Sequence, residues 1–126
     1  IKNLKFVHIE KVNKLKNFLI SKNINFFLNL SYSEGMSFSV MEAMSCNIPV
    51  IASNIPGNIE IINSRNGYII KKLDIPNYVQ ISKKIINDIN KKNFIKKKKY
   101  CENDFNKTVL RSINQKKLIK FFKGKF

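Results

Sequence analysis

The chain is poor in the residues from which metal sites and specific nucleic-acid interfaces are built. Only two of its 126 residues are cysteine, Cys46 and Cys101. They lie far apart and form no metal-ligand pattern, so we expect packed thiols in a reducing compartment. Arginine occurs only at Arg65 and Arg111. This scarcity disfavours the arginine forks of specific nucleic-acid recognition, and we expect no specific nucleic acid as a partner.

Long hydrophobic runs, repeats and Pro/Gly-rich linkers are also missing. No apolar run approaches the roughly 18 residues of a membrane span, and none follows a basic start, so we expect neither a transmembrane helix nor a signal peptide. With 44% hydrophobic residues, the chain can bury one core. Because it begins with isoleucine, we interpret residues 1–126 as a partial domain of a longer protein, with 100–126 as a basic C-terminal helix.

Positive charge is abundant, since 24 basic residues face 8 acidic ones and the formal net charge is +16. Such a charge attracts phosphate and anionic lipid. We interpret most of the lysines as a solvated face, and residues 96–99 as a loop or helix start in solvent. Residues 116–123 mix cations with bulky apolar groups, which suits a helix on an anionic membrane surface. The favoured alternative is a terminal helix that packs on its own domain or crosses back to another domain.

Short apolar runs alternate with helical periodicities along the chain. We expect strands over residues 4–9, 25–30, 50–52 and 68–70, and helices over residues 10–22, 38–46, 59–62, 78–90 and 104–122. This rhythm predicts an α/β fold, a Rossmann-like parallel sheet flanked by helices. Two helical faces are expected to cover the sheet, one made by Phe38, Val40, Met41, Ala43 and Met44, the other by Val79, Ile81, Ile85, Ile86 and Ile89.

The most informative stretch follows the second expected strand. Ligands bind beyond the carboxyl ends of parallel strands, and residues 31–37 lie at such an end. Gly35 permits a tight turn, Ser37 is a good N-cap for the next helix, and Asn47 suits the left-handed position after it. The first helical N–H groups lack internal partners and lie at the positive end of the helix dipole. This turn can therefore hold an anion, particularly a phosphate.

Two carboxylates bracket the helix start. Glu34 and Glu42 are eight positions apart, which corresponds to about 12 Å if both were helical. This separation suits the two ends of an extended ligand and not the carboxylate pair of a retaining glycosidase, at roughly 5 Å. The alternative is that both are ordinary surface acids.

A family resemblance adds to this interpretation. The runs SYSEGMSFSVMEAMSCNIPVIAS (residues 31–53) and GNIEIINSRNGYII (residues 57–70) contain, in order, Glu-Gly, Glu-Ala-Met, Pro-Val-Ile, Gly-x-x-Glu-Ile and Asn-Gly. Together they resemble the C-terminal, donor-binding half of a GT-B glycosyltransferase of the family 4 type, with its Glu-x7-Glu motif. The concatenation over about forty residues is more specific than any one of its parts.

The resemblance implies a retaining transfer of sugar from a nucleotide donor (UDP-, GDP- or ADP-linked) to a glycan or lipid-linked acceptor, without a bound metal or other cofactor. Glu34, the implied catalytic residue, would bind hydroxyls of the transferred sugar, and Glu42 the ribose. Backbone N–H groups of the helix start would bind the diphosphate. The implied donor-binding residues are Glu34, Gly35, Met36, Ser37, Phe38, Ser39 and Glu42.

Two further residues are weaker candidates. Glu60 would lie near the donor site, or else serve as a cap or in a sheet-edge ion pair. His8 stands where the family often has a glycine near the base, and a lone histidine is more often structural.

Departures from the family pattern leave alternatives open. Ser37 stands where glycine or proline is common, and Asn47 where glycine is usual. Residues 1–31 contain no match to the family's diphosphate-binding arginine and lysine, so we expect those residues and an N-terminal acceptor domain upstream, and an inactive isolated fragment. The resemblance also implies a cytoplasmic location, with peripheral binding to the inner face of the membrane as one option. The alternatives are a non-catalytic nucleotide- or sugar-binding module and a basic domain that binds membranes or nucleic acid.

Overall fold

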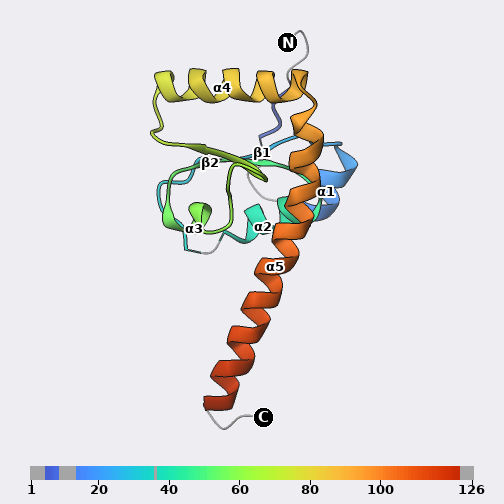
Figure 1. The fold of residues 1–126 in the computed structure, drawn as a ribbon, viewed down its shortest axis with the longest axis vertical. Helices are drawn as coiled ribbons and strands as arrows, with labels where there is room; N and C mark the ends of the chain where they lie inside the picture. The colour runs from blue at the N-terminus through green and yellow to red at the C-terminus, as the bar shows by residue number, and fades with distance from the viewer. Residues whose placement is uncertain (1–4, 9–13, 36, 123–126) are drawn as a thin grey trace.

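The structure is a computed structural model that describes residues 5–8, 14–35 and 37–122. Its elements, in chain order, are α1 (Leu15–Ser21), β1 (Phe27–Asn29), α2 (Phe38–Ser45), β2 (Val50–Ser53), α3 (Pro56–Ile59), β3 (Gly67–Ile70), α4 (Ile75–Asn90) and α5 (Asn93–Phe122). The three strands form one parallel sheet in the order β1-β2-β3 (Figure 1). This confirms the predicted α/β, Rossmann-like class, which is the arrangement of a GT-B C-terminal domain.

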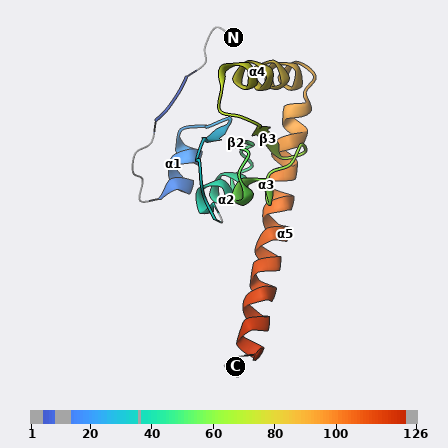
Figure 2. The same ribbon diagram turned by 90° about the vertical axis from the view of Figure 1, so that its left-hand side faces the viewer.

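The core lies between the sheet and helix α2. The central strand β2 contributes Val50 and Ala52, α2 contributes Val40, Ala43 and Met44, and the neighbouring helices add Leu19 and Cys101, all buried. Helix α2 contacts α1 on one side and α5 on the other, while α4 contacts β3. Figure 2 shows that α5 runs past the sheet and extends beyond the other elements.

Residues at the chain start differ from the prediction. A strand was predicted over 4–9, but residues 5–8 are exposed and form no strand, and the rest of that segment lies outside the described residues. A strand segment needs a partner for its backbone groups, and β1 pairs only with β2 in the described sheet. The predicted 10–22 helix is described from Leu15, with Lys14 as its non-helical N-cap.

Capping residues shift other helix starts. Pro56, whose fixed φ suits the first helical position, begins α3. The helix ends at Ile59, so it overlaps the predicted 59–62 helix only at its first residue. The Asp74 side chain accepts a hydrogen bond from the Asn77 N–H at 3.0 Å, so α4 begins at Ile75 and not at residue 78. Helix α2 has the predicted start, and Asn47 after it has the expected left-handed conformation, with φ of 60°.

Two predictions about surface lysines and apolar faces are wrong in part. Residues 96–99 lie inside α5, which begins at Asn93 and includes the predicted 104–122 helix, and Lys97 among them is buried. Phe38 is 72% exposed although Val40, Ala43 and Met44 are buried. In α4, Ile81 and Ile85 are half-buried, whereas Val79, Ile86 and Ile89 are exposed. Each helix therefore presents a narrower face to the sheet than its apolar residues suggested.

Candidate functional site

The candidate site is built at the carboxyl edge of the sheet. Asn29 is the last residue of β1 and pairs in register with Ala52, so it lies beside the end of β2, at Ser53. The Ser31 backbone lies between the two strand ends: its N–H donates to Asn29 Oδ1 at 3.2 Å, and its carbonyl accepts from the Ser53 hydroxyl. The loop that leaves β1 is thereby tied to both strands.

Asn29 positions the first candidate carboxylate. Its side-chain amide donates to Glu34 Oε2 at 3.0 Å and to Ser37 Oγ at 3.2 Å. The amide nitrogen carries two hydrogens, so both donors are used. Asn29 is buried and Glu34 is half-buried, and its second oxygen makes no hydrogen bond or ion pair with a described residue. The strand end, the loop carboxylate and the helix start therefore form one connected unit.

Ser37 occupies the predicted N-cap position of α2 but does not cap with its side chain. Its hydroxyl accepts from Asn29 and lies 3.3 Å from Ser39 Oγ, and it makes no hydrogen bond to a backbone N–H of the helix. Only its carbonyl serves the helix, accepting from the Met41 N–H at 3.1 Å. The prediction was wrong because Asn29, eight positions away, competes for the hydroxyl. The N–H groups of the first turn thus remain available to an anion.

Gly57 in α3 allows this helix to pack closely against the Glu34-Gly35 turn. A Cβ atom built on Gly57 would lie 1.6 Å from the Gly35 carbonyl oxygen and 2.8 Å from that of Glu34. Only a residue without a side chain permits this approach. The next residue, Asn58, is buried and donates to the Ser53 carbonyl at 3.1 Å. The start of α3 therefore packs directly against the Glu34-Gly35 turn.

The remaining predicted site residues are less tightly held. Glu42 is exposed on α2, and its carboxylate makes no ion pair or hydrogen bond with any described residue. Phe38 is exposed, Ser39 is half-buried at the helix start, and Met36 lies outside the described residues. Glu34, Gly35, Ser37, Phe38 and Ser39 thus lie together around the N-terminus of α2, with Glu42 further along the same helix.

Glu60 and His8 make no hydrogen bond or ion pair with the described residues of this unit. Glu60 is the exposed C-cap residue of α3, and within the described part of the chain it forms no ion pair, so the predicted sheet-edge pair is absent there. His8 is exposed in a segment with no helix or strand. Neither side chain hydrogen-bonds to a described residue.

Sequence reasoning missed Asn29, and it interpreted Gly57 as part of a turn without any contact to the site. A signal existed for Asn29, because it is the polar residue in the otherwise apolar run Phe26-Phe27-Leu28-Asn29-Leu30. A buried polar side chain at a strand end needs partners, and these are the site residues. For Gly57 the only signal was its place in the Gly-x-x-Glu-Ile run.

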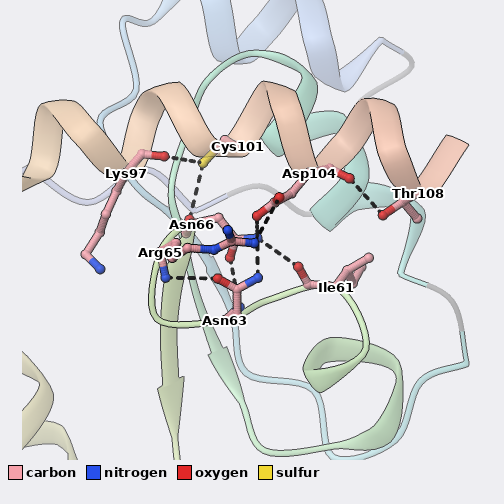
Figure 3. A network of polar contacts seen from close by, with 8 residues as sticks. All are labelled: Ile61, Asn63, Arg65, Asn66, Lys97, Cys101, Asp104 and Thr108. Carbon is pink, nitrogen blue, oxygen red and sulfur yellow. Dashed lines mark hydrogen bonds and ion pairs between the residues drawn. The ribbon is translucent and has the colours of Figure 1, made fainter.

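A second polar cluster joins the loop before β3 to helix α5 (Figure 3). Asp104 Oδ2 accepts from Asn66 Nδ2 at 2.9 Å and from Asn63 Nδ2 at 3.4 Å, and Oδ1 lies 3.5 Å from the Arg65 guanidinium. The buried Cys101 thiol donates to the Asn66 carbonyl at 3.2 Å. Burial raises the pKa of this thiol to about 12, so it is an inert packed group and not a nucleophile.

Two further groups with shifted pKa values, Tyr68 and Lys97, lie next to this cluster. The Tyr68 hydroxyl donates to Asp88 Oδ2 at 2.9 Å, and Lys97 Nζ lies 3.7 Å from the same oxygen and 4.7 Å from the Tyr68 ring centroid. Burial raises the pKa of Tyr68 and lowers that of Lys97. Perturbed groups often mark active sites. Here each partner is satisfied and buried between α4, β3 and α5, so we assign the cluster to helix docking.

Within residues 5–8, 14–35 and 37–122, no group of three or more histidine, cysteine, aspartate or glutamate residues gathers as a metal site would require. Among the same residues, no helix combines the length and apolar composition that crossing a bilayer would need.

Comparisons with known proteins agree on one family. The model of the family described as "Glycosyl transferases group 1" matches residues 2–102. The chain is 38% identical over 61 residues to "Glycosyltransferase 1 domain-containing protein 1" of Xenopus tropicalis, a match that covers 48% of this chain and 17% of that protein. It is 30% identical over 91 residues to "Capsular polysaccharide biosynthesis glycosyltransferase CapM" of Staphylococcus aureus, covering 70% of this chain and 24% of that protein. The matched segments thus span a quarter or less of either relative.

Proposed function

The chain belongs to the glycosyl transferases group 1 family, and we propose that it supplies part of the donor site of a family 4-like enzyme with a Glu-x7-Glu motif. The proposed reaction moves a sugar from a nucleotide-sugar donor to a glycan or lipid-linked acceptor, with retention of configuration and without a bound metal. One observation carries the proposal: Glu34 is held by Asn29 beside the open N-terminus of α2, at the carboxyl edge of the sheet.

The proposed roles follow from this placement. Glu34 has one oxygen held by Asn29 at 3.0 Å, which leaves the other to accept from hydroxyls of the transferred sugar. We assign the diphosphate to the N–H groups at the start of α2, from Met36 to Ser39, because a fixed helix N-terminus stabilises the charge that grows as the glycosidic bond breaks. Glu42, exposed on the same helix, would accept from the ribose hydroxyls.

The pathway and location are proposed from the relatives and from charge. The name of CapM supports polysaccharide or glycoconjugate biosynthesis as the setting. A cytoplasmic protein, peripheral on the inner face of the membrane, would meet both a nucleotide sugar and a lipid-linked acceptor, and the net charge of +16 favours anionic lipid. Since the matches span only 24% and 17% of the two relatives, we propose that transfer also needs the acceptor-binding domain and that this chain alone is inactive.

Ligand-detected NMR with UDP, GDP and ADP, and with the matching nucleotide sugars, tests the donor site at physiological salt. We expect saturation of ribose and base protons for one nucleotide, and its loss in Glu42→Ala. The matched control is Glu102→Ala, an exposed glutamate of α5, which should leave the signal unchanged. Glu34→Gln should retain the nucleotide signals and lose those of the sugar ring.

Two results would contradict the proposal. Equal weak signals for all three nucleotides, unaffected by Glu42→Ala and removed by added salt, would mean that lysine charge alone binds phosphate, which favours a basic interaction domain. Nucleotide binding without transfer or hydrolysis by the full-length protein would leave a non-catalytic binding module. Sugar transfer by this chain alone would refute the proposed inactivity of the fragment.

A further inference from the structure

Helix α4 exposes a stripe of aliphatic side chains along its whole length. Ile75 is 76% exposed, Val79 47%, Ile86 39% and Ile89 42%. At 3.6 residues per turn, these four positions fall within an arc of roughly 80° and extend over about 21 Å of the helix. We call these residues the α4 stripe. An exposed apolar stripe of this length marks an interaction surface more often than chance exposure.

The α4 stripe has no part in holding α4 to its own domain. That contact is made by a different side of the helix, where Ile81 and Ile85 are half-buried and Asp88 is bonded to Tyr68 and paired with Lys97. This side lies roughly 100° around the helix from the stripe. Among the described residues, the four aliphatic side chains remain between 39% and 76% exposed. Helix α4 therefore presents apolar groups to solvent as well as to the sheet.

Charge around the stripe is of one sign. Residues 71–92 contain six lysines and only two acidic residues, Asp74 and Asp88. Asp74 is bonded to the N–H of Asn77 as a cap, and Asp88 is buried. The six lysines are all exposed. Lys83 lies beside the stripe, Lys84 lies on the far side of the helix, and those at positions 71, 72, 91 and 92 come just before and after it. Cores of protein–protein interfaces are depleted in lysine. Lysines that flank an aliphatic stripe are typical of helices that lie in a lipid headgroup layer, where the long side chains reach the phosphates.

The position of α4 also suits a planar partner. Figures 1 and 2 both show the helix at one end of the molecule, lying across it, while α5 extends toward the opposite end. A flat surface can therefore approach α4 along its length without meeting the sheet. We propose that the α4 stripe and its flanking lysines dock the protein onto an anionic phospholipid surface. The inference builds on the peripheral location proposed above, and it is independent of sugar transfer.

Vesicle sedimentation tests this with the purified protein and its variants. We expect binding to vesicles of phosphatidylcholine with phosphatidylglycerol and much weaker binding to phosphatidylcholine alone. The double substitution Val79→Ser and Ile86→Ser should lower the partition coefficient on the order of tenfold, because two aliphatic groups no longer enter the lipid. The matched control, Ile20→Ser with Ile59→Ser, removes two more exposed isoleucines of α1 and α3 and should leave partitioning unchanged.

A second pair of variants separates specific docking from general charge. Lys83→Gln with Lys91→Gln, beside the stripe and at the C-cap of α4, should weaken binding several-fold more than Lys16→Gln with Lys22→Gln around α1. Circular dichroism and thermal unfolding check that each variant is folded. The donor-site NMR signals should be unchanged in the α4 variants, so a failure of this inference is distinct from a failure of the proposed function.

Three outcomes would overturn the inference. Unchanged partitioning of the Val79→Ser and Ile86→Ser variant would show that the stripe does not meet lipid. Equal losses for the two lysine pairs would show that only net charge matters. Unchanged lipid binding together with a lower mass by light scattering would assign the stripe to a contact between copies of the protein.

Discussion

Replacing Gly57 by alanine is the sharpest test of how the candidate site is held together. The new Cβ would lie 1.6 Å from the Gly35 carbonyl oxygen and 2.8 Å from that of Glu34. Ordinary contact between such atoms is at more than 3 Å, so α3 and the turn must separate by well over 1 Å. Overpacking of this kind costs about 1–3 kcal/mol. For a chain of 126 residues, this corresponds to a melting temperature lower by roughly 4–12 °C.

The same displacement should also lower the catalytic rate. Because Glu34 belongs to the turn that must move, its carboxylate would leave the position set by Asn29. Misplacement of a catalytic group by about 1 Å can reduce the rate by about a hundredfold. We therefore expect Gly57→Ala to lower kcat of the full-length enzyme more strongly than its apparent nucleotide affinity, when both are measured well below the new melting temperature.

Two other glycines provide matched controls. A Cβ on Gly35 would meet nothing within 4 Å, so Gly35→Ala should leave the melting temperature unchanged. A Cβ on Gly67 would lie 2.4 Å from the Val50 carbonyl oxygen, at the opposite end of the strands. Gly67→Ala should thus destabilise the fold without a selective loss of kcat. A Gly57→Ala protein with wild-type stability and kcat would refute the close packing of α3 on the turn.

Three other perturbations address the polar contacts. Asn29→Ala should reduce kcat at least tenfold with little change in nucleotide affinity, because Glu34 loses the 3.0 Å bond that orients it; equal kcat in steady-state assays would contradict this. Asp104→Asn should lower the free energy of unfolding in urea by about 1–3 kcal/mol, since one carboxylate oxygen becomes an NH2 group that must face either the Arg65 guanidinium or the Asn66 amide donor. Cys101 has an ordinary thiol pKa of 9.0 when unfolded and about 12 when folded, so above pH 9 the folded state retains a proton that the unfolded state loses. Its contribution to stability should fall as pH rises from 9 toward 12, by up to about 1.4 kcal/mol per pH unit, and Cys101→Ala should remove that part of the slope.

Local patterns in the sequence were sufficient for the architecture. Apolar runs of a few residues predicted the three strands that the structure contains, and helical periodicity predicted the helices between them. Proline and aspartate moved the starts of α3 and α4 by a few residues, because a cap acts on the backbone one turn away. The exposed Phe38 and the outward side of α4 were mispredicted, since periodicity identifies an apolar face but not which part of it meets a neighbour.

For the candidate site too, some features follow from the sequence alone and others only from the tertiary structure. The sequence by itself determined that Glu34 and the start of α2 lie at the carboxyl edge of a parallel sheet, because both follow β1 within a few residues and turn geometry is local. Their catalytic and donor-binding roles remain predictions. Only the tertiary structure decided that Asn29 takes the Ser37 hydroxyl from its capping role, that Gly57 approaches Gly35 across 22 positions, and that Lys97 is buried against Asp88. These contacts join residues of separate elements, and the packing of those elements selects the partners. No short-range pattern in the sequence therefore indicates them.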